Sequence, residues 1–216
     1  PELVQAVADL GYTQPTSVQL KAIPLAMGGG NDSTKFIDLM VSSQTGSGKT
    51  AAFLLPVLHT LINQQAAADA EERAAFERAV AEAAARGEPA PKRAKRKDPT
   101  SSRNFKAAPP GALILCPTRE LAQQVAHDAI DLVKHCRGLR VANVVGGMPY
   151  QLQIAKLQNA DLVVATPGRL LDLQRSMQIK LDKVQFLVVD EADRMLDLGF
   201  SDDLAELNQL TAQRKQ

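Results

Sequence analysis

The sequence predicts an α/β fold in which helices cover both faces of a mostly parallel central sheet. Short runs of apolar and β-branched residues recur at 37–43, 111–116, 140–145, 161–166 and 184–190. Stretches with helical spacing of apolar residues, such as 50–62 and 120–136, lie between these runs. The runs are nearly continuous in apolar residues, which is typical of strands buried on both faces. Strands that alternate with helices therefore favour a parallel sheet.

Length and composition limit the classes of protein to which the chain can belong. The chain has 216 residues, of which 45% are hydrophobic, and this is enough for one domain with a sizeable core. A net charge of +1 does not by itself indicate a nucleic-acid partner. Two cysteines and no signal-like N-terminus predict a reducing, cytoplasmic location. No apolar run approaches the roughly 18 residues of a membrane span. Because the chain opens without methionine, we expect it to be part of a longer protein.

Polar and glycine-containing stretches follow four of the predicted strands, at 42–50, 117–120, 166–169 and 190–193. Right-handed crossovers bring the carboxyl ends of parallel strands to one edge of the sheet. Ligands of open α/β sheets bind at that edge. The sequence therefore predicts one ligand site, assembled from segments that are far apart along the chain.

One region departs from this pattern and is interpreted as an insertion at 66–110. Its first half is rich in Ala, Glu and Arg, with a thin apolar stripe at Phe76, Val80 and Ala83, and predicts an exposed, partly formed helix. Its second half is basic and bounded by prolines, and predicts a disordered loop. A second polar, glycine-rich stretch at 28–35 predicts a surface loop.

The stretch SSQTGSGKT has the features of a phosphate-binding loop, although the generic pattern would have glycine in place of Ser43. Gly46 and Gly48 allow backbone N–H groups to face a phosphate. Lys49 would reach the outer phosphates, and the Thr50 hydroxyl would coordinate Mg²⁺. The alternative is an ordinary glycine turn before a helix.

The run FLVV ends at Asp190, which is placed to hold Mg²⁺ through water. Glu191 follows and could accept a proton from a water that attacks the γ-phosphate. The alternative is an acidic helix start, because Asp and Glu favour helix N-termini. Together with Lys49 and Thr50, the two acids favour a nucleotide-hydrolysing site.

With these residues in view, the chain resembles a DEAD-box RNA helicase of superfamily 2. The letters DEAD stand at 190–193, and the family's phosphate loop reads Ala-x-Thr-Gly-x-Gly-Lys-Thr, so that only Ser43 departs from it. The resemblance covers almost the whole chain outside 66–110. It implies the first of the family's two RecA-like domains, a three-layer sandwich, with ATP and Mg²⁺ as cofactors and Mg²⁺ held by Thr50 and Asp190.

The segment GYTQPTSVQ, at 11–19, resembles the adenine-reading Q motif. Gln19 would hydrogen-bond the adenine edge through its amide, with Tyr12 and Pro15 shaping the pocket and Thr16 supplying a hydroxyl. The alternative is a helix start with Gln19 as a surface amide. The resemblance implies nucleotide contacts at Tyr12, Gln14, Gln19, Gln44, Thr45, Gly46, Ser47, Gly48, Lys49, Thr50 and Asp190.

Three further segments resemble the family's RNA-contacting motifs, namely PTRELAQQ, a glycine doublet and TPGR. The resemblance implies RNA contacts at Pro117, Thr118, Arg119, Glu120, Gly146, Gly147, Thr166, Pro167, Gly168 and Arg169. Arginines can fork onto phosphate oxygens, and glycines let backbone N–H groups approach, so we expect sequence-independent binding. Helix caps and strand-end turns are the alternative reading of each motif.

The resemblance implies an ATP-dependent RNA helicase core that unwinds short duplexes or remodels ribonucleoproteins. A second RecA-like domain would complete the site, and Asp193 would couple it to a Ser-Ala-Thr motif that this sequence lacks. We expect ATP and RNA to close the two domains. We expect this chain alone to be monomeric, to hydrolyse ATP weakly and not to unwind RNA.

Two other functions remain compatible with the same residues. One is an ATP-gated RNA clamp or scaffold, and the other is a P-loop ATPase that acts on DNA. The basic run KRAKRK, at 92–97, could add nonspecific RNA affinity, act as a nuclear-localisation-like signal or simply be a solvated loop.

Overall fold

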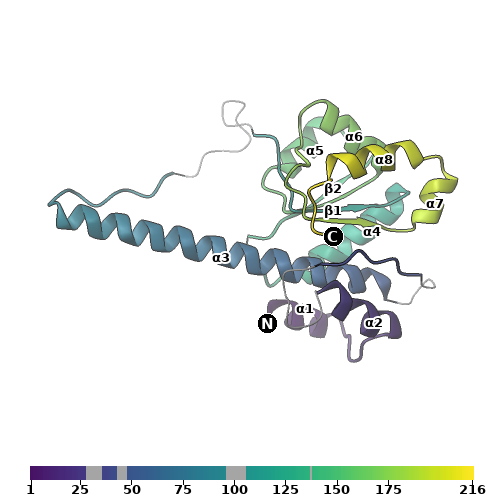
Figure 1. The fold of residues 1–216 in the computed structure, drawn as a ribbon, viewed down its shortest axis with the longest axis horizontal. Helices are drawn as coiled ribbons and strands as arrows, with labels where there is room; N and C mark the ends of the chain where they lie inside the picture. The colour runs from purple at the N-terminus through teal and green to yellow at the C-terminus, as the bar shows by residue number, and fades with distance from the viewer. Residues whose placement is uncertain (28–35, 43–47, 96–105, 137) are drawn as a thin grey trace.

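The computed structural model describes residues 1–27, 36–42, 48–95, 106–136 and 138–216. Its centre is a four-stranded, all-parallel sheet in the order β2-β3-β1-β4. The strands are β1 (Ala112–Leu115), β2 (Val141–Val144), β3 (Leu162–Ala165) and β4 (Phe186–Val189). Four of the five predicted strands are therefore confirmed, each inside its predicted run. Every consecutive pair of strands is linked by a helical crossover (Figure 1).

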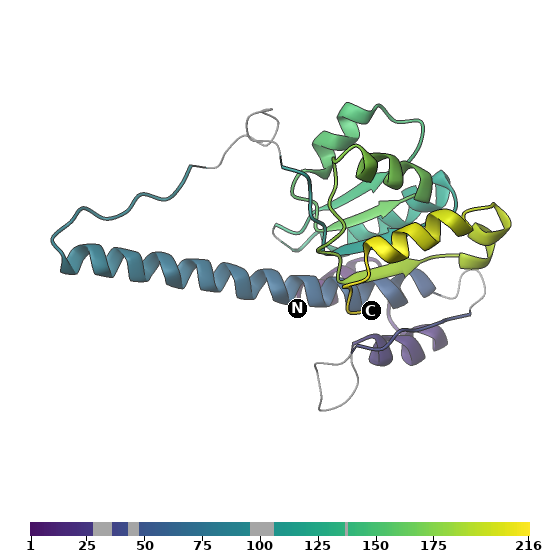
Figure 2. The same ribbon diagram turned by 45° about the horizontal axis from the view of Figure 1, so that its top comes forward.

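Helices cover both faces of the sheet, as predicted (Figures 1 and 2). They are α1 (Glu2–Asp9), α2 (Ser17–Ala26), α3 (Lys49–Ala85), α4 (Arg119–Leu132), α5 (Tyr150–Leu157), α6 (Pro167–Arg175), α7 (Ala192–Asp197) and α8 (Ser201–Leu210). Side chains alternate across a strand, so Ile114 packs with α3 and α4, whereas Leu113 and Leu115 pack with α5 to α8. Two hydrophobic cores result, one on each side of the sheet.

The fifth predicted strand, 37–43, was wrong in its described part, because 36–42 forms no strand. A strand needs a neighbour to pair with, and the outer edge of β4 bonds instead to the last residue, Gln216. The backbone N–H of Leu187 donates to the Gln216 carbonyl at 3.0 Å. The Gln216 side chain in turn donates to the Ile37 carbonyl. Gln216 thus lies between β4 and 36–42, and Met40 is fully exposed.

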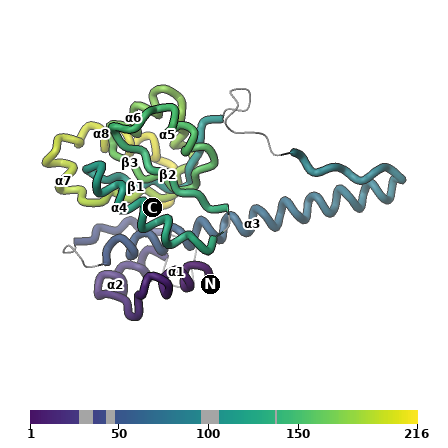
Figure 3. The backbone as a smooth tube through the Cα atoms, turned by 180° about the vertical axis from the view of Figure 1, so that it is seen from behind, coloured from purple at the N-terminus to yellow at the C-terminus, as the bar shows by residue number. Residues whose placement is uncertain are grey.

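Helix α3 is the longest element, with 37 residues. Its first third is buried against the sheet through Leu54, Leu58 and Leu61. Beyond that point it leaves the body of the domain as an exposed arm, which Figures 1 and 3 show from opposite sides. The alanine-rich half of the predicted insertion therefore continues a core helix without a break, in keeping with its helix propensity.

The chain returns from the tip of the arm through 86–95, which has no regular secondary structure. The Arg93 guanidinium lies 5.2 Å from the Phe76 ring centroid, so this segment runs back along α3. Ala108 is buried and forms a bridge with Ile179, which places the end of the predicted insertion within the core. The predicted loop at 28–35 and residues 96–105 lie outside the described residues. Within the described ranges, no helix has the length and apolar character to cross a membrane.

Candidate functional site

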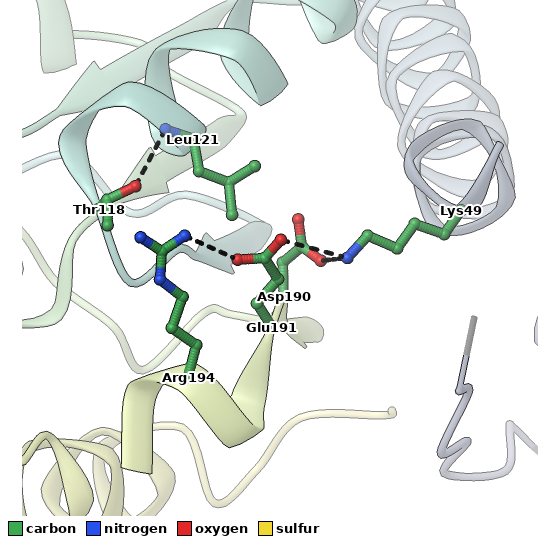
Figure 4. Close-up of polar contacts among 6 residues, drawn as sticks. All are labelled: Lys49, Thr118, Leu121, Asp190, Glu191 and Arg194. Carbon is green, nitrogen blue, oxygen red and sulfur yellow. Dashed lines mark hydrogen bonds and ion pairs between the residues drawn. The ribbon is translucent and has the colours of Figure 1, made fainter. Parts of the chain in front are cut away.

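The first side chain of α3 and the acids that follow β4 meet at the carboxyl edge of the sheet (Figure 4). Lys49 Nζ lies 3.1 Å from Asp190 Oδ1 and 3.8 Å from Glu191 Oε1. The backbone N–H of Asp190 donates to the Leu115 carbonyl at 2.9 Å, which extends the pairing of β4 with β1 by one residue. The fold therefore brings together three of the four residues for which a catalytic role was predicted. The fourth, Thr50, is partly buried in the first turn of α3.

Asp190 is buried, with a side chain only 3% exposed. Its Oδ1 is paired with Lys49, but its Oδ2 has no hydrogen-bond partner among the described residues. A buried carboxylate oxygen without a partner is costly unless a ligand or metal completes it. Glu191 adopts a left-handed backbone conformation, with φ of 52°, which is uncommon for a residue other than glycine. Backbone strain of this kind clusters at functional sites.

Burial raises the pKa of the nearby Cys116 thiol, and the negative charges of Asp190 and Glu191 raise it further. The thiol therefore stays protonated and acts as a packing group at the end of β1, since only a thiolate is a good nucleophile. This agrees with the position of Cys116 within the hydrophobic core.

The Q-motif segment is joined to the start of α3. Thr16 and Gln19 form a reciprocal capping box, in which the Thr16 N–H donates to Gln19 Oε1 at 3.0 Å. Gln19 Nε2 donates to the Gly48 carbonyl at 3.1 Å. The Gln19 amide thus ties the beginning of α2 to the end of the phosphate-loop segment. Tyr12 and Gln14 are exposed.

Gly48 is the N-cap of α3 and adopts the left-handed conformation, with φ of 79°. It forms no side-chain cap, so the first N–H groups of α3 are not satisfied in that way. A helix start of this kind attracts phosphate, and Lys49 adds a positive charge beside it. The predicted contacts Gln44, Thr45, Gly46 and Ser47 lie outside the described residues.

The predicted RNA-contacting residues lie at the ends of β1, β2 and β3. Thr118 is the N-cap of α4, and its Oγ1 accepts a hydrogen bond from the Leu121 N–H at 3.2 Å (Figure 4). Arg119 and Glu120 are exposed in the first turn of that helix. A Cβ placed on Gly147 would lie 2.4 Å from Arg119 Nη1, so the guanidinium rests against that glycine.

Some of the same residues have structural roles. Pro117 and Pro167 are buried, Pro117 between the end of β1 and the start of α4, and Pro167 as the first residue of α6. Thr166 precedes α6 without a side-chain cap. Arg169 Nη1 donates to the Met148 carbonyl and to Gln153 Oε1, each at 3.1 Å. At least part of this guanidinium is therefore occupied within the protein.

Comparison with known proteins shows which family the chain belongs to. The family model described as DEAD/DEAH box helicase matches residues 16–216. The chain belongs to this family. Its similarity extends over its whole length to proteins named as ATP-dependent RNA helicases. DEAD-box ATP-dependent RNA helicase 52A of Oryza sativa is 39% identical over 95% of this chain and 29% of its own length. ATP-dependent RNA helicase SrmB of Haemophilus influenzae is 37% identical over 100% of this chain and 39% of its own length.

Solved structures of related proteins share the fold. A hypothetical ATP-dependent RNA helicase from Sulfolobus tokodaii superposes with a TM-score of 0.71 and 33% identity, covering 99% of this chain and 48% of that one. The yeast DEAD-box splicing factor Prp28 gives a TM-score of 0.70 with 28% identity, covering 95% of this chain and 38% of that one. The RecA-like, three-layer fold is therefore confirmed. The chain spans less than half the length of these relatives.

Beside this DEAD-box site lies a cleft of about 1090 Å³. Lys49, Asp190, Glu191 and Asp193 line it, together with the segment that contains Met40. The ammonium group and the helix start suit phosphates, while the unpaired Asp190 oxygen and the hydroxyl of Thr50, the residue after Lys49, suit a hard cation such as Mg²⁺. The residues present therefore fit Mg-ATP.

The sequence analysis missed two side chains beside the RNA motifs, Gln153 and Tyr150. Gln153 is completely buried, and its Nε2 donates to the Val145 carbonyl at 2.5 Å. The Tyr150 ring lies beneath Arg169, with 4.1 Å from the guanidinium carbon to the ring centroid. A signal was present, because Gln153 shares the inward stripe of α5 with Ile154 and Leu157, at helical spacing.

Proposed function

We propose that this domain binds Mg-ATP and the backbone of single-stranded RNA. With a second RecA-like domain, it would hydrolyse ATP to unwind short RNA duplexes or remodel RNA–protein complexes. The observation that carries the proposal is the Lys49–Asp190–Glu191 cluster at the start of α3, where one buried carboxylate oxygen lacks a partner. The RNA candidates end neighbouring strands of the same sheet, which supports communication between the two ligands.

The residues of the chain have distinct tasks in this proposal. Lys49 would leave its carboxylate partners and bind the outer phosphates, with the first N–H groups of α3 beside it. Asp190 and Thr50 would hold Mg²⁺, which when bound would offset phosphate charge. Glu191 would accept the proton of the attacking water. Asp193, which is exposed on α7, would face the second domain.

Domain closure would complete the site, because half of the charge stabilisation of the transferred phosphate would come from the second domain. We therefore expect the isolated chain to bind nucleotide weakly and to hydrolyse it poorly. RNA binding is expected to be sequence-independent, since its candidate contacts are backbone groups, hydroxyls and Arg119 rather than readers of base edges. ATP-dependent strand separation by this chain alone would contradict the requirement for a second domain.

Calorimetric titration with Mg-ADP and, in parallel, Mg-GDP tests the nucleotide site. We expect ADP to bind and GDP to bind more weakly, with binding lost in Lys49→Ala. Gln19→Ala should weaken ADP binding and, unlike Lys49→Ala, also loosen the link to Gly48. Equal binding of ADP and GDP would remove the adenine-reading role of the Q motif. Failure of both nucleotides to bind would reject the proposed site in this chain.

Stimulation of ATP hydrolysis in the two-domain protein separates the alternatives. Stimulation by RNA but not by DNA is expected, and stimulation by DNA alone would favour a DNA-acting ATPase. Unwinding measured in a single turnover, compared with the lifetime of the RNA complex, distinguishes a helicase from an ATP-gated clamp.

A further inference from the structure

A buried amide lies beneath the turn that carries the glycine doublet. Gln153 has no exposed surface, yet it is polar, and both ends of its amide are bonded. Its Nε2 donates to the Val145 carbonyl at 2.5 Å, and its Oε1 accepts from Arg169 Nη1 at 3.1 Å. The amide therefore connects the end of β2 to the first turn of α6. Buried polar groups that are fully bonded specify a single arrangement of the groups around them.

Arg169 extends this connection to the other end of the turn. The same Nη1 donates to the Met148 carbonyl at 3.1 Å, and the guanidinium stacks over the Tyr150 ring at 4.1 Å. Tyr150 is itself tied to α6, because its hydroxyl donates to Asp172 Oδ2 at 3.1 Å. The turn from Val145 to Tyr150 is thus fixed at both ends by α5 and α6.

Inside this turn, Gly147 has a φ of 84°, which favours glycine, and the Arg119 guanidinium rests on it. The position of the turn therefore limits where Arg119 can lie. Gly146 and Gly147 also present the backbone N–H groups that were predicted to approach a phosphate. Small displacements of such groups weaken binding, because charge-assisted hydrogen bonds depend on geometry.

We propose that Gln153 is a positioning residue for RNA binding, which holds the glycine turn in place through Val145 and Arg169. The proposal rests on the proposed function and deepens it. In this proposal Arg169 mainly connects the turn to α6. Arg119 and the backbone N–H groups of the glycines bind the phosphate. Loss of the Gln153 amide should let the turn move without altering the nucleotide site.

The test is Gln153→Met, which keeps a similar volume but cannot form either hydrogen bond. We expect the dissociation constant of a single-stranded oligouridylate of about ten nucleotides to rise about tenfold, a change of about 1.4 kcal/mol. Hydrogen exchange of the amides at 145–148 should become faster, while the affinity for Mg-ADP stays unchanged. RNA affinity is measured by fluorescence anisotropy at low salt.

Gln158→Met is the matched control. Gln158 is also a buried glutamine at the end of α5, but among the described residues its side chain donates only to the Ile154 carbonyl of the same helix, at 3.5 Å. We expect its RNA affinity to match that of the wild type. Tyr150→Leu provides a second test at a more exposed position and should weaken RNA binding about threefold by removing the ring under Arg169.

A double-mutant cycle tests the connection itself. If Gln153 acts through Arg169, then Gln153→Met combined with Arg169→Met should bind RNA about as weakly as Arg169→Met alone. The proposal would be overturned if the losses of RNA-binding free energy in the two single variants added up in the double variant. It would also be overturned if folded Gln153→Met showed unchanged RNA affinity and unchanged hydrogen exchange. RNA binding that survives every one of these substitutions would reject this inference alone. A wild-type chain that binds no RNA would reject it together with the proposed RNA function.

Discussion

Replacement of Gly48 by alanine tests whether the Q-motif segment and the phosphate-loop segment are packed as one unit. A Cβ at this position would lie 2.5 Å from Gln19 Nε2 and 3.0 Å from Thr16 Oγ1. Gln19 can swing away only by giving up its hydrogen bond to the Gly48 carbonyl. The alanine would also have to adopt a φ of 79°, which costs about 1–2 kcal/mol.

A matched control separates these two costs. Gly87 has a φ of 70°, yet a Cβ there would meet no atom within 4 Å. Gly87→Ala should therefore lower the free energy of unfolding by only about 1 kcal/mol, the cost of a positive φ for alanine. Gly48→Ala should lower the free energy of unfolding by about 2 kcal/mol more than Gly87→Ala does, because it breaks a hydrogen bond and displaces the Thr16 side chain.

Thermal unfolding provides the assay. For a chain of this size, about 2 kcal/mol corresponds to roughly 4–8 °C in Tm, so Gly48→Ala should melt that much below Gly87→Ala. Mg-ADP affinity should fall in Gly48→Ala and stay unchanged in Gly87→Ala. Equal Tm values for the two variants would refute the reasoning, because they would show that the contact with Gln19 and Thr16 contributes nothing.

Three further predictions follow from particular contacts. Thr118→Ala should lower Tm by about 2–4 °C through loss of an N-cap worth about 1 kcal/mol, whereas Thr166→Ala, at an N-cap without a side-chain bond, should not. The hydrogen bond from His135, with Lys134 beside it, lowers the pKa of Asp9 from 3.8 to about 2. Its stabilising effect is present above about pH 4 and is lost as the pH falls to about 2, so the stability difference between wild type and Asp9→Asn, followed by chemical denaturation, should shrink over that range. Replacing 67–105 by a short glycine–serine linker should preserve Mg-ADP affinity and weaken RNA binding at low salt, and unchanged RNA affinity would indicate a merely solvated arm.

The sheet was predictable from the sequence because parallel strands buried on both faces need continuous apolar runs, such as ALIL in β1. The meeting of Lys49, Asp190 and Glu191 in a candidate nucleotide site was predictable because their own side chains carry its chemistry. That the described part of 37–43 forms no strand was not predictable from the sequence. A strand depends on a pairing partner, and the edge of β4 is bonded to Gln216.

The contacts that hold the candidate RNA-binding residues in place were also not predictable from the sequence. A motif indicates that Arg169 is present, but not that its guanidinium donates to Met148 and Gln153. Those contacts depend on how α5 packs against β2, which local patterns do not determine. The same holds for Gln19, whose amide serves the capping box and the Gly48 carbonyl.

The length of α3 has a practical consequence for measuring motion in this domain. The helix begins at Lys49, the proposed phosphate-binding residue, and ends at Ala85, so its 37 residues span about 55 Å. A pivot of about 5° about its first turn would displace the tip by about 5 Å. The tip around Gly87 is exposed and distant from the proposed nucleotide and RNA sites, which suits it to carry a fluorophore or an imaging fiducial. Optical distance measurement from this tip would therefore test whether nucleotide binding moves the start of α3.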